Sequence, residues 1–207
     1  MIDTSIIFNS AIITIGFYSI IPVIGFLLNQ LELLEFKILS MFFGNGFASF
    51  FCDRITFIGT VLHELSHALF ATLTGAKVTK ISIMDFFQGG QLGHVEFVTR
   101  GNLIIRSIQL VFASCAPVLV GVFALIMIFP LIKAKDVPMP IRILAIYAFI
   151  SILNHTSMSG QDLALYMKGI FLVLPLTFFA LTIADIFFGF LPKAKDIPDI
   201  LKKFCQA

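Results

Sequence analysis

Long apolar runs separated by short polar segments extend over almost the whole chain. A helix that crosses a membrane needs about 20 consecutive, mostly apolar residues. The runs predict five such spans, which cover residues 6–28, 55–74, 103–132, 143–157 and 170–191. The third run is long enough to tilt or to begin outside the membrane, and the fourth is shorter than the others. The pattern therefore predicts an all-α, polytopic protein with about five transmembrane helices.

The segment between the first two spans has a different pattern. Four polar residues interrupt the apolar run after residue 28: Gln30, Glu32, Glu35 and Lys37. The next apolar stretch, residues 38–51, is short and Gly44-Asn45-Gly46 divides it, which favours a re-entrant or interfacial segment. We expect a single membrane domain (1–207) without internal repeats. Its parts are an anchor with the re-entrant segment (1–54), a core (55–170), and a last span with a polar, short-helical tail (171–207).

A polar insertion, residues 75–102, separates the second and third spans. Residues 78–83 and 94–98 alternate partly between apolar and polar side chains, and Gly89-Gly90 lies between them. This pattern predicts a small β-hairpin with a long loop. An edge strand at a membrane surface can bind another chain by main-chain pairing, but a purely structural flap has the same pattern. Both interpretations stay open at this point.

The composition agrees with a membrane location. Hydrophobic residues make up 58% of the 207 residues, charged residues make up 13%, and the mean hydropathy is +1.01. A soluble domain has about 45–50% apolar and about 25% charged residues, and so short a chain cannot bury this much apolar surface by folding alone. An ordinary soluble domain and a disordered chain are therefore excluded, and the net charge of +2 is too small for a nucleic-acid partner. We expect a multi-pass protein of the cell membrane.

The second span contains the sequence His63-Glu64-Leu65-Ser66-His67, which is an H-E-x-x-H motif. Residues four apart lie on one face of a helix, so His63 and His67 can present two imidazoles to one zinc ion, with Glu64 beside them as general base. By chance the motif is expected only about 0.0015 times in a chain of this composition. Two histidines that bridge neighbouring helices are the alternative, but ionisable groups inside a membrane are costly and usually mark function. The sequence therefore predicts a Zn²⁺ site here.

A catalytic zinc normally has three protein ligands and one open position, so a third ligand must come from another segment. The candidates are Asp162, His155, His94, Glu96 and Asp185. Asp162 follows the fourth span, but Ser159-x-x-Asp162 is also the spacing of a helix-capping pair. Three roles are open for His155: it can be a zinc ligand, it can support a ligand by a hydrogen bond, or it can be a buried histidine without a role in metal binding. His94 and Glu96 fit solvated positions of the hairpin, and Glu96 would be the third ligand of another zincin type.

Several of these features together resemble the site-2 protease family of intramembrane zinc metalloproteases. Residues 63–67 followed by Gly75 are similar to the first core helix of that family, and residues 114–117 (Ser-Cys-Ala-Pro) are similar to the small-residue and proline stretch of its next core helix. Asp162 resembles the family's third zinc ligand, and Asn154 stands eight residues before it, as an asparagine does in the family. The polar hairpin resembles the family's substrate-binding edge.

The resemblance covers residues 55–170 and has implications for the site. The zinc ligands that it implies are His63, His67 and Asp162. The substrate-binding residues that it implies are Asn154, Ile81 and Val95. The sequence also departs from the family: Leu163 follows the aspartate where the family has glycine, and Val120 replaces an asparagine. With no accessory domain, the chain looks like a divergent, minimal member.

These observations predict a zinc-dependent intramembrane endopeptidase whose partners are a membrane protein or peptide substrate and the lipid bilayer. The alternative is a multi-span transporter, or another metal- or proton-binding membrane protein without protease activity, because intramembrane His and Asp also form relays. Such a protein does not require Glu64 between two ligands, and an odd number of spans without internal symmetry fits inverted-repeat transporters poorly. A non-catalytic binder would also have no need for Glu64.

Overall fold

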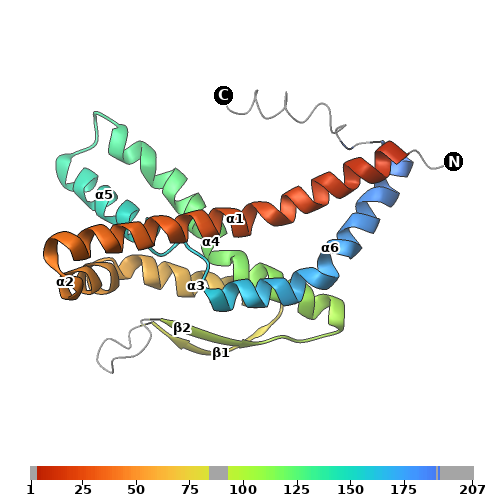
Figure 1. Cartoon of the computed structure of the whole chain (residues 1–207), viewed down its shortest axis with the longest axis horizontal. Helices are drawn as coiled ribbons and strands as arrows, with labels where there is room; N and C mark the ends of the chain where they lie inside the picture. The colour runs from red at the N-terminus through yellow and green to blue at the C-terminus, as the bar shows by residue number, and fades with distance from the viewer. Residues whose placement is uncertain (1–3, 84–92, 190, 192–207) are drawn as a thin grey trace.

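The computed structural model describes residues 4–83, 93–189 and 191, and helices dominate it (Figure 1). The helices are α1 (Thr4–Phe43), α2 (Asn45–Ser49), a π-helical turn η1 (Phe50–Ile55), α3 (Phe57–Leu73), α4 (Leu103–Lys133), α5 (Met139–Leu153) and α6 (Gly160–Phe188). The strands are β1 (Lys77–Ser82) and β2 (His94–Val98). The predicted helical fold with a small hairpin after the H-E-x-x-H helix is therefore confirmed.

Three of the described helices, α1, α4 and α6, are long and apolar enough to cross a membrane. α3 and α5 have 17 and 15 residues, fewer than the about 20 that a full crossing needs. The predicted count of five full spans is therefore not supported. The long helices expose large apolar side chains such as Phe17, Phe123 and Phe171, which are 64, 63 and 87% exposed. Such surfaces are compatible with contact with lipid.

The interruption predicted after residue 28 is wrong, because α1 continues without a break to Phe43. Glutamate, glutamine and lysine are good helix formers, and Glu32 Oε2 accepts a hydrogen bond of 2.9 Å from Ser157 Oγ. The chain turns at Gly44, whose φ of 83° suits a glycine, and continues as α2 and η1. The segment predicted as one unit, residues 38–51, is therefore divided between the end of α1 and these two short elements.

The last predicted span begins earlier than expected. α6 starts at Gly160 rather than at residue 170, and it ends at Phe188 before Gly189, whose φ is 57°. A capping box at Ser159 explains the early start, because it satisfies backbone groups of the first turn. The predicted polar tail, residues 192–207, lies outside the described residues.

β1 and β2 form an antiparallel pair with a bulge between Val78 and Lys80. Ile81 lies opposite Val95 in the register. Because the described sheet has only these two strands, each strand has one edge that no described strand covers. The predicted turn residues Gly89-Gly90 lie outside the described part of the chain.

α4 is the central helix and packs against α3, α5 and α6. Val111 and Cys115 of α4 form an apolar core with Tyr166 and Val173 of α6. α1 lies across α6 and α4 (Figure 1), and Tyr166 Oη donates a 2.6 Å hydrogen bond to the backbone oxygen of Tyr18. The core thus joins the N-terminal helix to the helices that carry the candidate site.

Gln109 of α4 fixes both ends of the hairpin segment. Its side chain is 1% exposed, Nε2 donates to the backbone oxygen of Thr74 at 3.0 Å, and Oε1 accepts from the backbone N–H of Arg100 at 2.8 Å. Buried polar groups are normally satisfied in this way. The hairpin is therefore anchored beside α3 and α4, the two helices next to the candidate site.

Candidate metal centre

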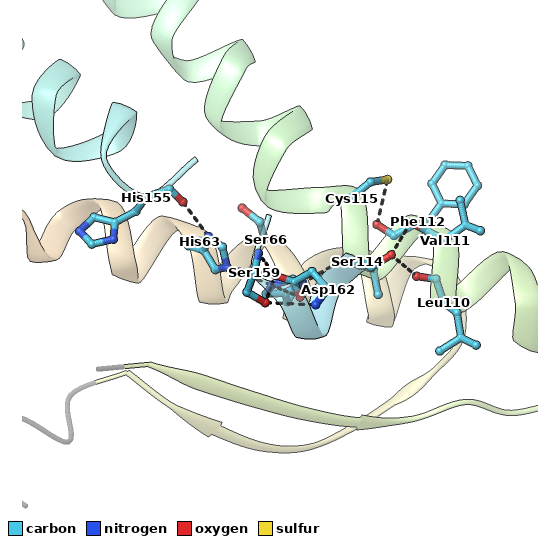
Figure 2. Close-up of polar contacts among 12 residues, drawn as sticks. His63, Ser66, Leu110, Val111, Phe112, Ser114, Cys115, His155, Ser159 and Asp162 are labelled. Atoms are coloured by element: carbon cyan, nitrogen blue, oxygen red, sulfur yellow. Dashed lines mark hydrogen bonds and ion pairs between the residues drawn. The ribbon is translucent and has the colours of Figure 1, made fainter. Parts of the chain in front are cut away.

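α3 carries two residues of the candidate site on one face. It begins after Thr56 and ends before Gly75, whose φ of 86° is unfavourable for other residues. His63 and His67 lie one turn apart, as their spacing predicts, and their ring centroids are 4.9 Å apart. Asp162 comes from the first turn of α6 and lies beside His63 (Figure 2), with its Oδ1 3.3 Å from His67 Nε2. Two helices therefore supply the site.

The three side chains converge on one point. His67 Nε2 lies 3.2 Å from His63 Nε2 and 3.3 Å from Asp162 Oδ1, and His63 Nε2 lies 3.9 Å from Asp162 Oδ2. A tetrahedral zinc with ligand bonds of about 2.0–2.1 Å places two ligand atoms about 3.3 Å apart. Two imidazoles and one carboxylate also match the ligand types that zinc accepts. The residues and their separations therefore fit a zinc ion with one open position.

Backbone carbonyls hold both imidazoles in the orientation that a metal requires. His63 Nδ1 lies 2.6 Å from the backbone oxygen of His155 (Figure 2), and His67 Nδ1 lies 2.7 Å from that of Ala113. Each Nδ1–H donates to its carbonyl, so the lone pair is on Nε2, which faces the convergence point. The two carbonyls come from the segment after α5 and from α4. Packing of α3 against these helices therefore orients the ligands.

Asp162 caps α6 and also lies next to His67, two positions that its sequence context presented as alternatives. Its Oδ2 accepts hydrogen bonds from the backbone N–H and the hydroxyl of Ser159, at 3.0 and 2.7 Å, and its own N–H donates to Ser159 Oγ at 3.1 Å. This reciprocal pair caps α6. Oδ1, the other oxygen, is the atom 3.3 Å from His67 Nε2. One carboxylate can thus cap the helix and face the metal position at once.

Glu64 borders a small cavity next to the three candidate ligands. The cavity has a volume of about 80 Å³ and lies between α3, the start of α6 and β2. This volume can hold a few water molecules. Glu64 is 9% exposed and is not one of the converging groups. Its carboxylate is therefore available to exchange a proton with a ligand in the cavity.

The ring of His155 points away from His63 and Asp162 (Figure 2). Its Nε2 lies 3.0 Å from Thr56 Oγ1 and 3.4 Å from Thr60 Oγ1. His155 is therefore not the third ligand in this geometry, and it supports His63 through its backbone oxygen instead. Asn154 is 3% exposed and borders a separate apolar cavity of about 330 Å³ next to α1. Asn154, the substrate-binding residue that the resemblance implies, therefore does not line the metal cavity.

The hairpin brings one of its two predicted substrate contacts to the cavity. Val95 lines the cavity, whereas Ile81 on β1 is 46% exposed and does not line it. His94 also lines the cavity, although its sequence position fitted a solvated residue, and its Nε2 lies 3.1 Å from Glu96 Oε1. Asp185 lies at the opposite end of α6 from Asp162, and its Oδ1 accepts a hydrogen bond from the N–H of Leu191. It is therefore not part of the candidate metal site.

Some residues of the site were missed by sequence reasoning. The carbonyl of Ala113 has no sequence signal, because every residue carries a backbone oxygen. Gly93 is buried against Glu64 and was also missed, although a glycine next to a predicted strand can mark a close backbone approach. The sequence signal of Ser159 is that of a helix cap, and does not show that the residue lines the metal cavity.

Comparison of the chain with protein-family models, with curated proteins and with solved structures found no match. The function must therefore be inferred from the residues and the geometry of the site itself.

Proposed function

We propose that this protein is a zinc-dependent endopeptidase that cleaves peptide bonds of membrane-embedded or membrane-proximal substrates. The proposal is carried by one observation, the convergence of His63, His67 and Asp162 beside the carboxylate of Glu64. A transporter or a passive metal site needs ligands, but it does not need an acid–base group next to an open coordination position. The resemblance to site-2 proteases supports the same conclusion.

We infer that the chemistry takes place within the membrane. At 1.5 Å per residue, α3 and α5 are about 26 and about 22 Å long, somewhat less than the about 30 Å hydrocarbon core of a bilayer. Both pack against the long apolar helix α4. They also expose apolar residues, such as Leu69 of α3 and Leu144 of α5. In this arrangement five helices are embedded in the membrane, and the polar cavity next to Glu64 admits the water that hydrolysis consumes.

In the proposed reaction the protein positions water and peptide and moves one proton. Bound zinc would polarise the scissile carbonyl and make a water molecule more acidic. Glu64 accepts a proton from the attacking water and passes it to the amide nitrogen, so that the carbon–nitrogen bond breaks and an acid and an amine are released. His63 and His67 stay fixed by their backbone partners throughout.

The substrate must present an unwound segment, because the backbone hydrogen bonds of a helix shield its peptide bonds. A groove of about 520 Å³ follows β2 between the hairpin, α4 and α6, and His94, Val95 and Gln161 border both this groove and the metal cavity. An extended peptide that pairs with an uncovered strand edge would lie along the groove. Its path would lead past Glu64.

The test is cleavage of a single-span peptide in proteoliposomes. Zinc-loaded wild-type protein should release fragments that mass spectrometry detects. Glu64→Gln should lower the rate about 10²–10⁴-fold, which is the usual contribution of a general base, and should keep its zinc. Glu35→Gln is the matched control, since it makes the same change on α1 at a residue that does not line the metal cavity.

Two outcomes would contradict the proposal. Cleavage by Glu64→Gln at the wild-type rate would exclude its role as general base. Zinc flux into the vesicles that persists in Glu64→Gln, with no cleavage by either protein, would favour the transporter.

A further inference from the structure

His94 is the first residue of β2, and it lines the metal cavity together with Glu64. Its Nε2 lies 3.1 Å from Oε1 of Glu96, which is two positions along the same strand and therefore on the same side. The two side chains are 37 and 52% exposed, and an exposed pair of this kind contributes little to stability. An interaction with a ligand in the cavity explains the position of His94 better than hairpin stability does.

Gly93 brings the start of β2 into direct contact with Glu64. A Cβ atom added at Gly93 would lie 2.5 Å from Cγ and 2.9 Å from Oε1 of Glu64, closer than real Cβ contacts. A residue with a Cβ here would force the Glu64 side chain to move, whereas glycine lets the backbone approach it as it stands. The hairpin backbone therefore forms one wall of the metal cavity, and His94 is held next to the place where Glu64 would act.

We propose that His94 donates a hydrogen bond to the carbonyl oxygen of the scissile peptide bond as that oxygen gains negative charge. This inference rests on the proposed endopeptidase function and adds a catalytic residue to it. The Glu96 carboxylate accepts a hydrogen bond from Nε2–H and so orients the ring. Nδ1 donates to the substrate when the imidazole carries a second proton, because only the doubly protonated ring has an N–H on both nitrogens. A donor aimed at a developing oxyanion is a large contribution to catalysis in many hydrolases. Glu96 is then a positioning residue.

The test compares His94→Ala, His94→Gln and Glu96→Gln with wild-type protein. We expect His94→Ala to lower kcat about 10²–10³-fold, as the loss of one oxyanion donor does, with KM and zinc content within about twofold of wild type. A phosphinic peptide, which imitates the tetrahedral state, should bind about 10²-fold more weakly to zinc-loaded His94→Ala when measured by calorimetry. His94→Gln retains an N–H donor and should recover part of both losses, and Glu96→Gln should cause a smaller fall than His94→Ala.

Lys77→Ala is the matched control, since Lys77 is an exposed residue of the same hairpin that does not line the metal cavity. Its kcat should equal that of wild type. If wild type cleaves and Glu64→Gln does not, but His94→Ala keeps its kcat and its affinity for the phosphinic peptide, the role of His94 is excluded and the proposed function stands. A parallel loss of zinc and activity in His94→Ala would also exclude it. If wild type neither cleaves nor binds the phosphinic peptide, both proposals fail.

Discussion

Gly59 lies where α3 meets α5, and replacing it with alanine tests how the candidate metal ligand His63 is oriented. An added Cβ would lie 1.9 Å from the backbone oxygen of Ser151 and 2.6 Å from Cδ2 of His155. Real Cβ contacts essentially never fall below 3.0 Å, so the end of α5 must move away from α3 by about 1 Å, an overpacking that typically costs about 1–3 kcal/mol of stability. The 2.9 Å bond from the Gly59 N–H to Ser151 Oγ would be stretched as well.

The same displacement should weaken metal binding. The carbonyl of His155 follows directly after α5 and holds His63 Nδ1 at 2.6 Å. A shift of about 1 Å would break or lengthen this bond, and the loss of such a supporting contact typically lowers metal affinity about 10–100-fold. We therefore expect Gly59→Ala to bind zinc at least about 10-fold more weakly and to unfold at a lower temperature.

Competition with a chromogenic chelator measures the zinc affinity, and thermal unfolding in detergent measures the stability. Gly16→Ala is the matched control, because it makes the same substitution in α1 where nothing lies within 4 Å of the added Cβ. Alanine is the better helix former by about 1 kcal/mol, so Gly16→Ala should retain wild-type zinc affinity and equal or greater stability. If Gly59→Ala binds zinc as tightly as Gly16→Ala, orientation of His63 by the α3–α5 contact is refuted.

Two further predictions concern the origin of the third ligand. Ser159→Ala removes the hydroxyl that caps α6 and holds Asp162 Oδ2. The variant should lose about 1 kcal/mol of stability, and its zinc affinity should fall about 10–100-fold. Unchanged affinity in the chelator assay would show that the position of Asp162 does not depend on this cap. Asp162→Ala should lose zinc on dialysis, whereas His155→Ala keeps the carbonyl that supports His63 and should retain it. Metal analysis of both variants checks this, and equal loss in the two would contradict the assignment of Asp162.

Much of the fold could be predicted because its determinants are local. A backbone in lipid must satisfy its own hydrogen bonds, so long apolar runs predict helices whatever they pack against. Several boundaries were not predicted: the fourth span was placed at 143–157 whereas α5 covers Met139–Leu153, and the end of α1 and the start of α6 also differ. The polar residues after residue 28 are compatible with an end of the first helix and with its continuation. In the structure α1 continues, and the hydrogen bond between Glu32 and Ser157 is consistent with that. The Ser159-x-x-Asp162 pattern indicated a helix start, but the apolar run alone placed the beginning of the last span at residue 170, whereas α6 begins at Gly160.

The amino-acid sequence alone determined that the chain is mainly helical, with runs long and apolar enough to cross a membrane, and that His63, Glu64 and His67 lie within one turn of a helix with the two histidines on one face, because these properties follow from hydrophobicity and from the period of the helix. Only the tertiary structure decided which distant residue lies next to the two histidines. Asp162 and His155 were both possible from spacing, and packing turned the ring of His155 toward Thr56 while the first turn of α6 carried Asp162 to His67. The contact of the Gly93 backbone with Glu64 was likewise decided by packing, since distances between separate segments depend on how the helices and the hairpin fit together.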